Sequence, residues 1–284
     1  MDVQLLLVPY DTARRGWRSG AGPEHLIQAG LVAHLRGEGH TVADIQVIEI
    51  NSGGPAAEIA TAFELMRHVA VAVRTARAAG RFPLVLGGNC NTAIGTLSGL
   101  TPSRRAVFWF DAHGDLNTPD TTPSGFLDGQ GLATALGNGW KQLAATVPGF
   151  QPVEPADTFL LGARDLDPPE QALIDSTGIN AVATSEIPSR LAALLAKLHL
   201  DGALAYAHLD PDVLDPAVGQ GNWLRVPDGL SVTQVTEALA AIRARVPLGA
   251  VGVASYAPEY DTQQSVCRAI FAAVDAMLGG LEDS

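Results

Sequence analysis

Three clusters of polar residues could hold metal ions, and each follows a stretch that is predicted to be a β-strand. The clusters are GGNC at residues 87–90, DAHGDLN at residues 111–117 and HLDPD at residues 208–212. In open α/β sheets ligands bind beyond the carboxyl ends of the strands, so the three clusters can meet in one crevice.

The second cluster carries Asp111, His113 and Asp115 at a spacing of two residues. At a strand end this spacing predicts all three side chains on one side of the pleat. Asp210 and Asp212 repeat the spacing on another strand. These groups would repel one another unless a cation lay among them, and carboxylates with an imidazole suit divalent ions such as Mn²⁺. Two ions about 3.5–4 Å apart could share and activate a water molecule.

The alternative interpretation is that these acids are ordinary turn and cap aspartates at strand ends. That interpretation suits a single aspartate better than two clusters on separate strands, so we favour the metal site. His208 precedes Asp210 by two residues and could point the same way. For this histidine we favour a strand-end side chain with its hydrogen bonds satisfied.

The elements that must position these clusters follow from an alternation of β-rich runs with Ala-rich helical patterns. Strands are predicted at residues 3–8, 41–50, 83–86, 105–110, 158–161, 179–183, 203–209 and 250–254. Helices are predicted at residues 23–35, 55–79, 130–136, 169–176, 189–198, 232–245 and 262–278, with a turn at 51–55. Ser231 is a candidate N-cap for the helix over 232–245. The alternation predicts one three-layer α/β domain over residues 1–284, with a parallel sheet of roughly eight strands.

Composition narrows the function classes. The chain has 284 residues, a formal net charge of −12, 47% hydrophobic residues and two cysteines. The acidic balance argues against nucleic acid or an anionic membrane as the main partner. No apolar stretch reaches the roughly 18 residues of a spanning helix, and the N-terminus lacks the features of a signal peptide. We therefore expect a cytoplasmic protein without a disulfide scaffold.

The second and third clusters resemble the two metal signatures of the arginase/agmatinase (ureohydrolase) family. The likeness extends from Arg18 to Glu259. It implies a single α/β domain on an eight-stranded parallel sheet, and a binuclear manganese site that hydrolyses guanidino or amidino C–N bonds. It also implies a homo-oligomer, such as a trimer or hexamer.

The same resemblance implies roles for the individual metal ligands. Asp111 and Asp210 would bridge both ions. Asp115 would bind one ion, and His113 and Asp212 would bind the other. In such a site Asp115 could also pass a proton to the leaving amine.

Four further residues match positions that hold the amino-acid end of the substrate in arginases. Asn117 and Ser124 would hold the α-carboxylate, and Asp167 and Glu170 the α-amino group. The alternative is ordinary loop capping by these residue types. Their joint match favours a small α-amino acid as the substrate.

The sequence departs from the family at a metal-ligand position, where Cys90 replaces a histidine. A thiolate is softer than Mn²⁺ prefers, so one ion could be weak, absent or of another kind. Alternatively Cys90 is only a small buried residue. A branch that resembles the Nω-hydroxyarginine amidinohydrolases also has cysteine here, and shares the patterns at residues 117–122 and 226–229.

Two further departures concern catalysis and substrate choice. Asp128 matches the histidine that assists proton transfer. It could relay protons if its pKa were raised, it could face a cationic substrate group, or it could be only a turn residue.

The glutamate that clamps the guanidinium has no counterpart in residues 252–258, and Glu259 and Asp261 come a few residues later. Tyr256 could offer a hydroxyl there, although a core position is the better expectation. Without that charge-assisted pair arginine should bind poorly, and an N-hydroxylated arginine should lose less.

The sequence therefore predicts a metal-dependent amidinohydrolase that releases ornithine together with urea or hydroxyurea. One alternative is an impaired family member that binds a ligand or partner without turnover. Another is a hydrolase of a different C–N bond, such as a formimino group. Arg14, Arg15, Trp17 and Arg18 cluster in the first strand–helix loop and either line the pocket mouth or form a solvated or subunit-contact loop.

Overall fold

The centre of the molecule is one eight-stranded sheet in which every pairing is parallel. The computed structural model describes residues 1–50, 57–100, 104–198 and 202–279. In the order β4-β1-β5-β10-β9-β6-β7-β8, the strands are Thr41–Val47, Asp2–Val8, Phe82–Gly87, Leu248–Val253, Leu204–Leu209, Arg105–Phe110, Thr158–Leu161 and Asn180–Val182. The predicted fold class and all eight predicted strands are confirmed. A small antiparallel pair, β2 (Tyr10–Asp11) and β3 (Arg14–Arg15), follows β1.

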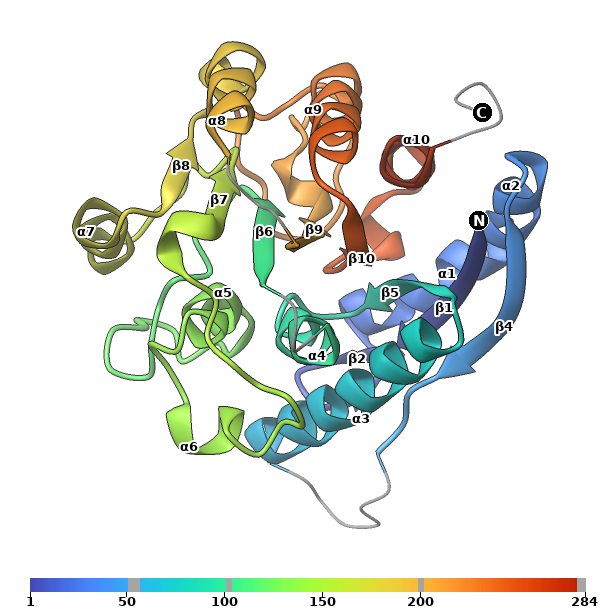
Figure 1. Cartoon of the computed structure of the whole chain (residues 1–284), viewed down its shortest axis with the longest axis horizontal. Helices are drawn as coiled ribbons and strands as arrows, with labels where there is room; N and C mark the ends of the chain where they lie inside the picture. Colours follow the sequence, from blue (N-terminus) through green and yellow to red (C-terminus); the bar gives the residue numbers. More distant parts are fainter. Residues whose placement is uncertain (51–56, 101–103, 199–201, 280–284) are drawn as a thin grey trace.

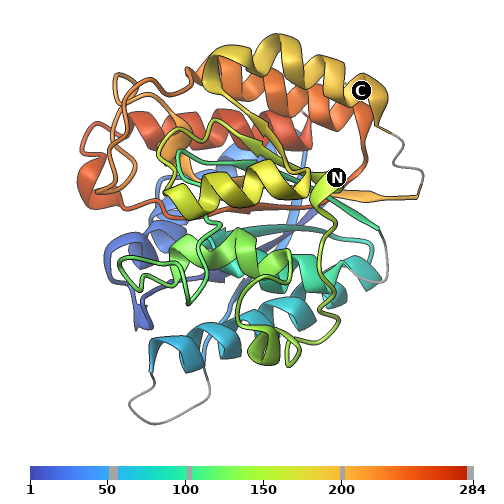
Figure 2. The same ribbon diagram turned by 90° about the vertical axis from the view of Figure 1, so that its left-hand side faces the viewer.

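Helices cover both faces of this sheet (Figures 1 and 2). One apolar core lies under α1, α2, α8, α9 and α10, which are Gly22–Gln28, Leu31–Gly37, Ala192–Lys197, Val232–Arg245 and Ser265–Leu278. The other lies under α3, α4, α5 and α7, which are Glu58–Ala78, Thr92–Gly99, Gly131–Ala135 and Pro168–Thr177. A short α6 spans Lys141–Ala144 at the edge of the second layer. Among the described residues no helix is long and apolar enough to cross a membrane.

Several predicted bounds differ from those in the structure. The helix predicted over residues 23–35 is two helices, because Gly30 adopts a left-handed φ of 102° between α1 and α2. The strand predicted over 41–50 ends at Val47. The turn predicted at 51–55, and the start of the helix predicted from residue 55, lie outside or at the edge of the described residues. Ser231 caps α9 as predicted, since its Oγ accepts from the Gln234 backbone N–H at 3.2 Å.

Helix α4 was not predicted from the sequence, because its glycines and threonines have low helix propensity. Tertiary packing stabilises it instead. A side chain at Gly95 would collide with Met66 and Val69 of α3, and one at Gly99 would collide with Val73. The two glycines thus let α3 and α4 pack closely, and α4 holds the loop after β5 in place.

The sheet brings the predicted clusters to one edge. Strands β5, β10, β9 and β6 are neighbours, and each ends at the same side of the sheet. The loops after these strands carry residues 88–91, 254–257, 210–213 and 111–117. Positions as far as 165 residues apart in sequence are thereby in contact at this edge.

Candidate active site

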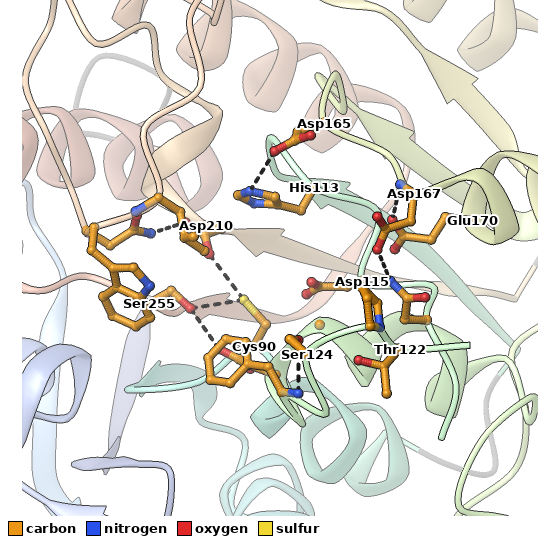
Figure 3. Close-up of a pocket in the computed structure, with 18 residues that line it drawn as sticks. Cys90, His113, Asp115, Thr122, Ser124, Asp165, Asp167, Glu170, Asp210 and Ser255 are labelled. Atoms are coloured by element: carbon orange, nitrogen blue, oxygen red, sulfur yellow. Dashed lines mark hydrogen bonds and ion pairs between the residues drawn. The ribbon is translucent and has the colours of Figure 1, made fainter. Parts of the chain in front are cut away.

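The loops at the carboxyl edge enclose a pocket of about 170 Å³ (Figure 3). Its size suits a small molecule. The lining includes nine of the predicted site residues, which are Cys90, His113, Asp115, Asn117, Ser124, Asp128, Asp167, Glu170 and Asp210. Asp111 and Asp212 lie directly behind this lining, in contact with His113.

The two acidic clusters meet at His113. Its Nδ1 lies 3.3 Å from Oδ1 of Asp111 and 3.2 Å from Oδ2 of Asp212. One atom each of Asp111, His113 and Asp212 lies within 4.8 Å of the others, an arrangement that could hold a metal ion. The loop backbone fixes the acids, since Asp111 Oδ1 accepts from the His113 N–H and Asp212 Oδ1 from the Ala112 N–H.

The side chains of Asp111, His113 and Asp115 converge, but not because they alternate along a strand as predicted. Strand β6 ends at Phe110, so Asp111, His113 and Asp115 lie in the loop beyond the pleat. Asp115 has a φ of 50°, a left-handed conformation that is rare for residues other than glycine. The turn of this loop, and not strand alternation, directs the three side chains toward Asp210 and Asp212.

The charges of these residues fit a bound cation. Burial raises the pKa of Asp111 to about 6, with Asp212 adding to the effect, and raises the pKa values of Asp115 and Asp210 further. Burial alone would lower the pKa of His113, but its hydrogen bonds to Asp111 and Asp212 outweigh this and raise it to about 12. Oδ2 of Asp115 is buried without a hydrogen-bond partner among the described residues. The donor set therefore matches divalent metal ions.

Cys90 is buried among these acids and lines the pocket. Its Sγ lies 3.3 Å from Oδ2 of Asp210 and 3.2 Å from Oγ of Ser255. Burial and the nearby acids raise the pKa of the thiol, so a bound cation would be needed to make it a thiolate. The position of Cys90 is thus compatible with metal ligation and also with a purely structural role as a small buried residue.

Asp128 is part of the pocket wall and is not an exposed turn residue. Its Oδ2 accepts from Nδ2 of Asn89 at 2.9 Å and from Oγ of Ser255 at 3.3 Å, and its Oδ1 accepts from the Asn91 N–H. Burial raises its pKa to about 7 despite these hydrogen bonds. Ser255 therefore contacts both Cys90 and Asp128, two positions where the sequence departs from the family that it resembles.

The other end of the pocket holds the four predicted substrate residues. Nδ2 of Asn117 donates to Oδ2 of Asp167 at 2.8 Å. Glu170 accepts from the Asp167 N–H and the Leu116 N–H, both at 2.9 Å, so it caps α7 and fixes the loop after β6. Ser124 is exposed and accepts from the Phe126 N–H. The capping interpretation thus holds for Glu170, and all four side chains also line the pocket.

Two contributing residues, Asn222 and Trp109, were missed by sequence reasoning. Nδ2 of Asn222 donates to Oδ2 of Asp212 at 3.2 Å, and no motif signals this residue. Nε1 of Trp109 donates to Oδ2 of Asp111 at 3.1 Å, and its position two residues earlier in the strand could have signalled it. Trp223 lines the pocket, and the guanidinium of Arg18 lies 4.7 Å from its ring centroid. Arg18 therefore contacts the pocket rim.

Tyr256 and Asp261, which the sequence places near the missing guanidinium-binding glutamate, have structural roles. Tyr256 is 1% exposed, and its hydroxyl donates to Oδ2 of Asp261 at 3.1 Å. Asp261 also accepts from the backbone N–H of Cys267 in the first turn of α10. Both residues thus lie in the core, as expected for Tyr256, and neither lines the pocket.

Known proteins resemble this chain along nearly its whole length. The sequence matches the Arginase family over residues 1–279. It is 33% identical to the arginase of Bacillus subtilis (strain 168) over 243 residues, which cover 81% of each chain. It is 32% identical to the arginase of Bacillus caldovelox, over 81% of this chain and 82% of that one.

Solved structures give the same result for the fold. The crystal structure of arginase from Bacillus cereus superposes with a TM-score of 0.88 and 29% identity, covering 98% of this chain and 99% of that one. The formimidoylglutamase of Bacillus subtilis subsp. subtilis str. 168 superposes with a TM-score of 0.77 at 19% identity, over 100% of this chain and 88% of that one. At that identity the second likeness concerns the fold alone.

The fold, the pocket and the relatives together define an amidinohydrolase, an enzyme that hydrolyses C–N bonds in amidines. More specifically, the chain belongs to the arginase family, whose members are binuclear manganese enzymes.

Proposed function

We propose that this protein hydrolyses the guanidino C–N bond of an arginine-like amino acid, with an N-hydroxylated arginine preferred over arginine. The products are ornithine and urea or hydroxyurea. The observation that carries the proposal is the pocket itself. One end gathers the acids and His113, and the other holds Asn117, Ser124, Asp167 and Glu170.

We assign two Mn²⁺ positions to the acidic end. Asp111 and Asp210 would contribute to both positions, Cys90 and Asp115 would contribute to one, and His113 and Asp212 would contribute to the other. The sulfur of Cys90 makes the first position weaker for Mn²⁺ or open to a different ion. When bound, the ions lower the pKa of the attacking water and stabilise the developing charge.

The protein's own side chains handle the protons. Water adds to the planar guanidino carbon. The bond between this carbon and the nitrogen attached to Cδ of the substrate then breaks, and that nitrogen accepts a proton and leaves as the side-chain amine of ornithine. Asp115 and Asp128 both line the pocket. We assign delivery of the proton to Asp115, with Asp128 as the second acid of the site. Burial raises the pKa values of both acids, to about 7 for Asp128, which favours a bound proton on each of them.

The preference for an N-hydroxylated substrate rests on the pocket wall beside Cys90. Ser255 presents a neutral hydroxyl there, and Asp128 already accepts three hydrogen bonds. A fully charged guanidinium would lack a dedicated carboxylate partner at this wall. A less basic hydroxyguanidine loses less from that absence.

The distal end orients the amino-acid part of the substrate, which brings the guanidino carbon to the acids. Asn117 and Ser124 offer an amide and a hydroxyl to a carboxylate. Asp167 and Glu170 offer carboxylates to an ammonium group. By resemblance to the family, we also propose a cytoplasmic homo-oligomer, a trimer or hexamer, which light scattering on the purified protein would measure.

The test is a substrate panel with protein incubated in Mn²⁺. Nω-hydroxyarginine, arginine and N-formimino-glutamate are compared by release of ornithine or glutamate. We expect the highest kcat/KM for hydroxyarginine, and no turnover by the double variant Asp115→Ala/Asp210→Ala. Activity on the formimino acid alone would favour the other C–N bond, and no turnover of any compound by metal-loaded protein would favour a binding protein.

A further inference from the structure

We propose that His208 supplies a nitrogen ligand to the metal position beside Cys90. This gives that position a sulfur, a nitrogen and carboxylate oxygens, a donor set for a borderline ion such as Zn²⁺ or Co²⁺. The inference deepens the metal site of the proposed function and is tested by metal binding, without any substrate.

The first observation is a second cluster of potential ligands next to the one at His113. One atom each of Cys90, Asp111 and His208 lies within 4.8 Å of the other two. All three residues are buried, and His208 has no exposed surface. The two clusters share Asp111, so they mark two neighbouring metal positions.

The second observation is an unsatisfied atom. Nε2 of His208 is buried and has no hydrogen-bond partner among the described residues. Leaving a buried polar atom unpaired costs about 1–3 kcal/mol, so this atom calls for a partner that the described residues do not supply. In the proposed site Nε2 is the ring nitrogen that faces Cys90 and Asp111, and an ion bound among the three residues would satisfy it.

The surroundings hold His208 in a position to act as a ligand. Its ring stacks on Trp109, with centroids 3.7 Å apart and planes inclined by 17°. Its Nδ1 lies 2.9 Å from the Tyr206 hydroxyl. When Nδ1 carries the proton and donates to Tyr206, the lone pair lies on Nε2. Metal-binding histidines are typically held by such a hydrogen bond through the other ring nitrogen.

The dimensions of the cluster suit an ion. Ligands at about 2.0–2.3 Å around a tetrahedral ion lie roughly 3.3–3.8 Å from one another. The three atoms lie within 4.8 Å of one another, so binding an ion would draw them together by at most about 1–1.5 Å. The competing role for His208 is an Nε2–H that donates to an acid from outside the metal position. No acceptor lies within hydrogen-bond distance of Nε2 among the described residues, so we favour ligation.

The experiment is a Co²⁺ titration of metal-free full-length protein, read by absorption and elemental analysis. A thiolate-to-cobalt band in the near ultraviolet reports the Cys90 position. His208→Phe keeps a ring against Trp109 but removes both nitrogens. We expect it to weaken the binding that produces this band by more than about 100-fold, beyond the 10–100-fold typical of outer-shell partners. A smaller loss would overturn the proposal.

Controls separate the site from general effects. Cys90→Ser should abolish the band, whereas Cys267→Ser and His34→Gln, at residues away from the pocket, should leave it unchanged. If His208→Phe does not fold, X-ray absorption of the Co²⁺-loaded His113→Asn variant decides the question. Imidazole scattering that persists there supports His208 as a ligand, and its absence overturns the proposal. Either result stands whatever compound the enzyme hydrolyses.

Discussion

At the scale of single residues, the pocket keeps ionisable groups in an environment that opposes their charge. Asp115 is buried, has an oxygen without a partner in the described structure, and lies near Asp111, Asp128 and Asp210. In the folded protein without a bound cation, these buried acids therefore destabilise the region around the pocket. Such a cost is expected where a protein is built to bind an ion, and it predicts opposite effects of one substitution on stability and on activity.

Asp115→Asn should stabilise the metal-free protein by about 1 kcal/mol, because it removes a buried carboxylate whose Oδ2 has no hydrogen-bond partner in the described structure. The same change should lower kcat with the Mn²⁺-loaded enzyme by at least about 100-fold, since it removes a proton-transfer group and a metal ligand. Urea denaturation of metal-free protein and ornithine release measure the two effects. Asp120→Asn, an exposed loop acid, is the control and should change neither. Activity within tenfold of the parent protein would contradict the role of Asp115.

At the scale of elements, each site loop is held by the helix or strand next to it. Glu170 is the third residue of α7, and its carboxylate joins the helix start to the loop at Leu116. Gly88 allows the loop after β5 to lie against the backbone at Tyr10 and Gly20. The geometry of the pocket thus depends on caps and close backbone contacts as well as on the pocket residues.

Two capping residues allow a matched comparison. Glu170→Ala and Gln234→Ala each remove the acceptor for the N-cap backbone N–H of a helix, α7 and α9 respectively. Each should lower the free energy of unfolding by about 1 kcal/mol. Glu170→Ala alone should raise KM for α-amino-acid substrates, because Glu170 also lines the pocket and holds the Leu116 N–H. Equal KM values for the two variants would argue against a substrate role for Glu170.

A pair of glycines tests the close contact of the site loop. A Cβ at Gly88 would overlap the Tyr10 carbonyl oxygen and approach the Cα of Gly20. Gly88→Ala should therefore destabilise the protein by about 1–3 kcal/mol and reduce metal binding at the neighbouring Cys90. At Gly37, in the last turn of α2, a Cβ would meet no atom within 4 Å. Gly37→Ala should be neutral or slightly stabilising in thermal melts, and a comparable loss there would refute the explanation.

At the scale of the whole molecule, the sheet converts loops from distant parts of the chain into one charged centre. Asp111, Asp115, Asp128 and Asp210 all have raised pKa values with burial as the first cause. A raised carboxyl pKa means that the folded protein binds a proton more tightly than the unfolded chain does. The stability that the folded protein gains from this tighter proton binding is therefore lost as pH rises toward the folded pKa.

The metal-free protein should accordingly lose stability between about pH 6.5 and 8. His208 is a buried histidine with a lowered pKa, so its contribution to stability rises with pH. That opposite effect is confined to pH values below 6.5, the ordinary pKa of histidine. His113, whose pKa is raised to about 12, acts in the same direction as the acids above pH 6.5. Thermal melts should show Tm falling by several degrees over this range, and Mn²⁺ should raise Tm more at pH 8 than at pH 6.5. A metal-free Tm that rises with pH would contradict the electrostatic account.

The sequence by itself determined the repeating βα order, the eight strands and the residue types of the site. Alternating patterns and turn residues are local signals, so the strands over residues 105–110 and 158–161 were predicted with their observed bounds. The cap at Ser231 depends only on residues three positions apart. The acidic signatures at residues 111–115 and 210–212 likewise needed no tertiary information.

Only the tertiary structure decided how these residues meet. Contacts between Cys90 and Ser255 span 165 positions, and those between Asn89 and Asp128 span 39. Helix α4 forms because its glycines fit against α3, which its own propensities do not predict. The placement of His208, whose Nε2 has no partner within the described part of the chain, depends on the stacking of Trp109 and on Tyr206. Loops beyond strand ends have no internal periodicity, so their conformation is fixed by neighbours from other parts of the chain.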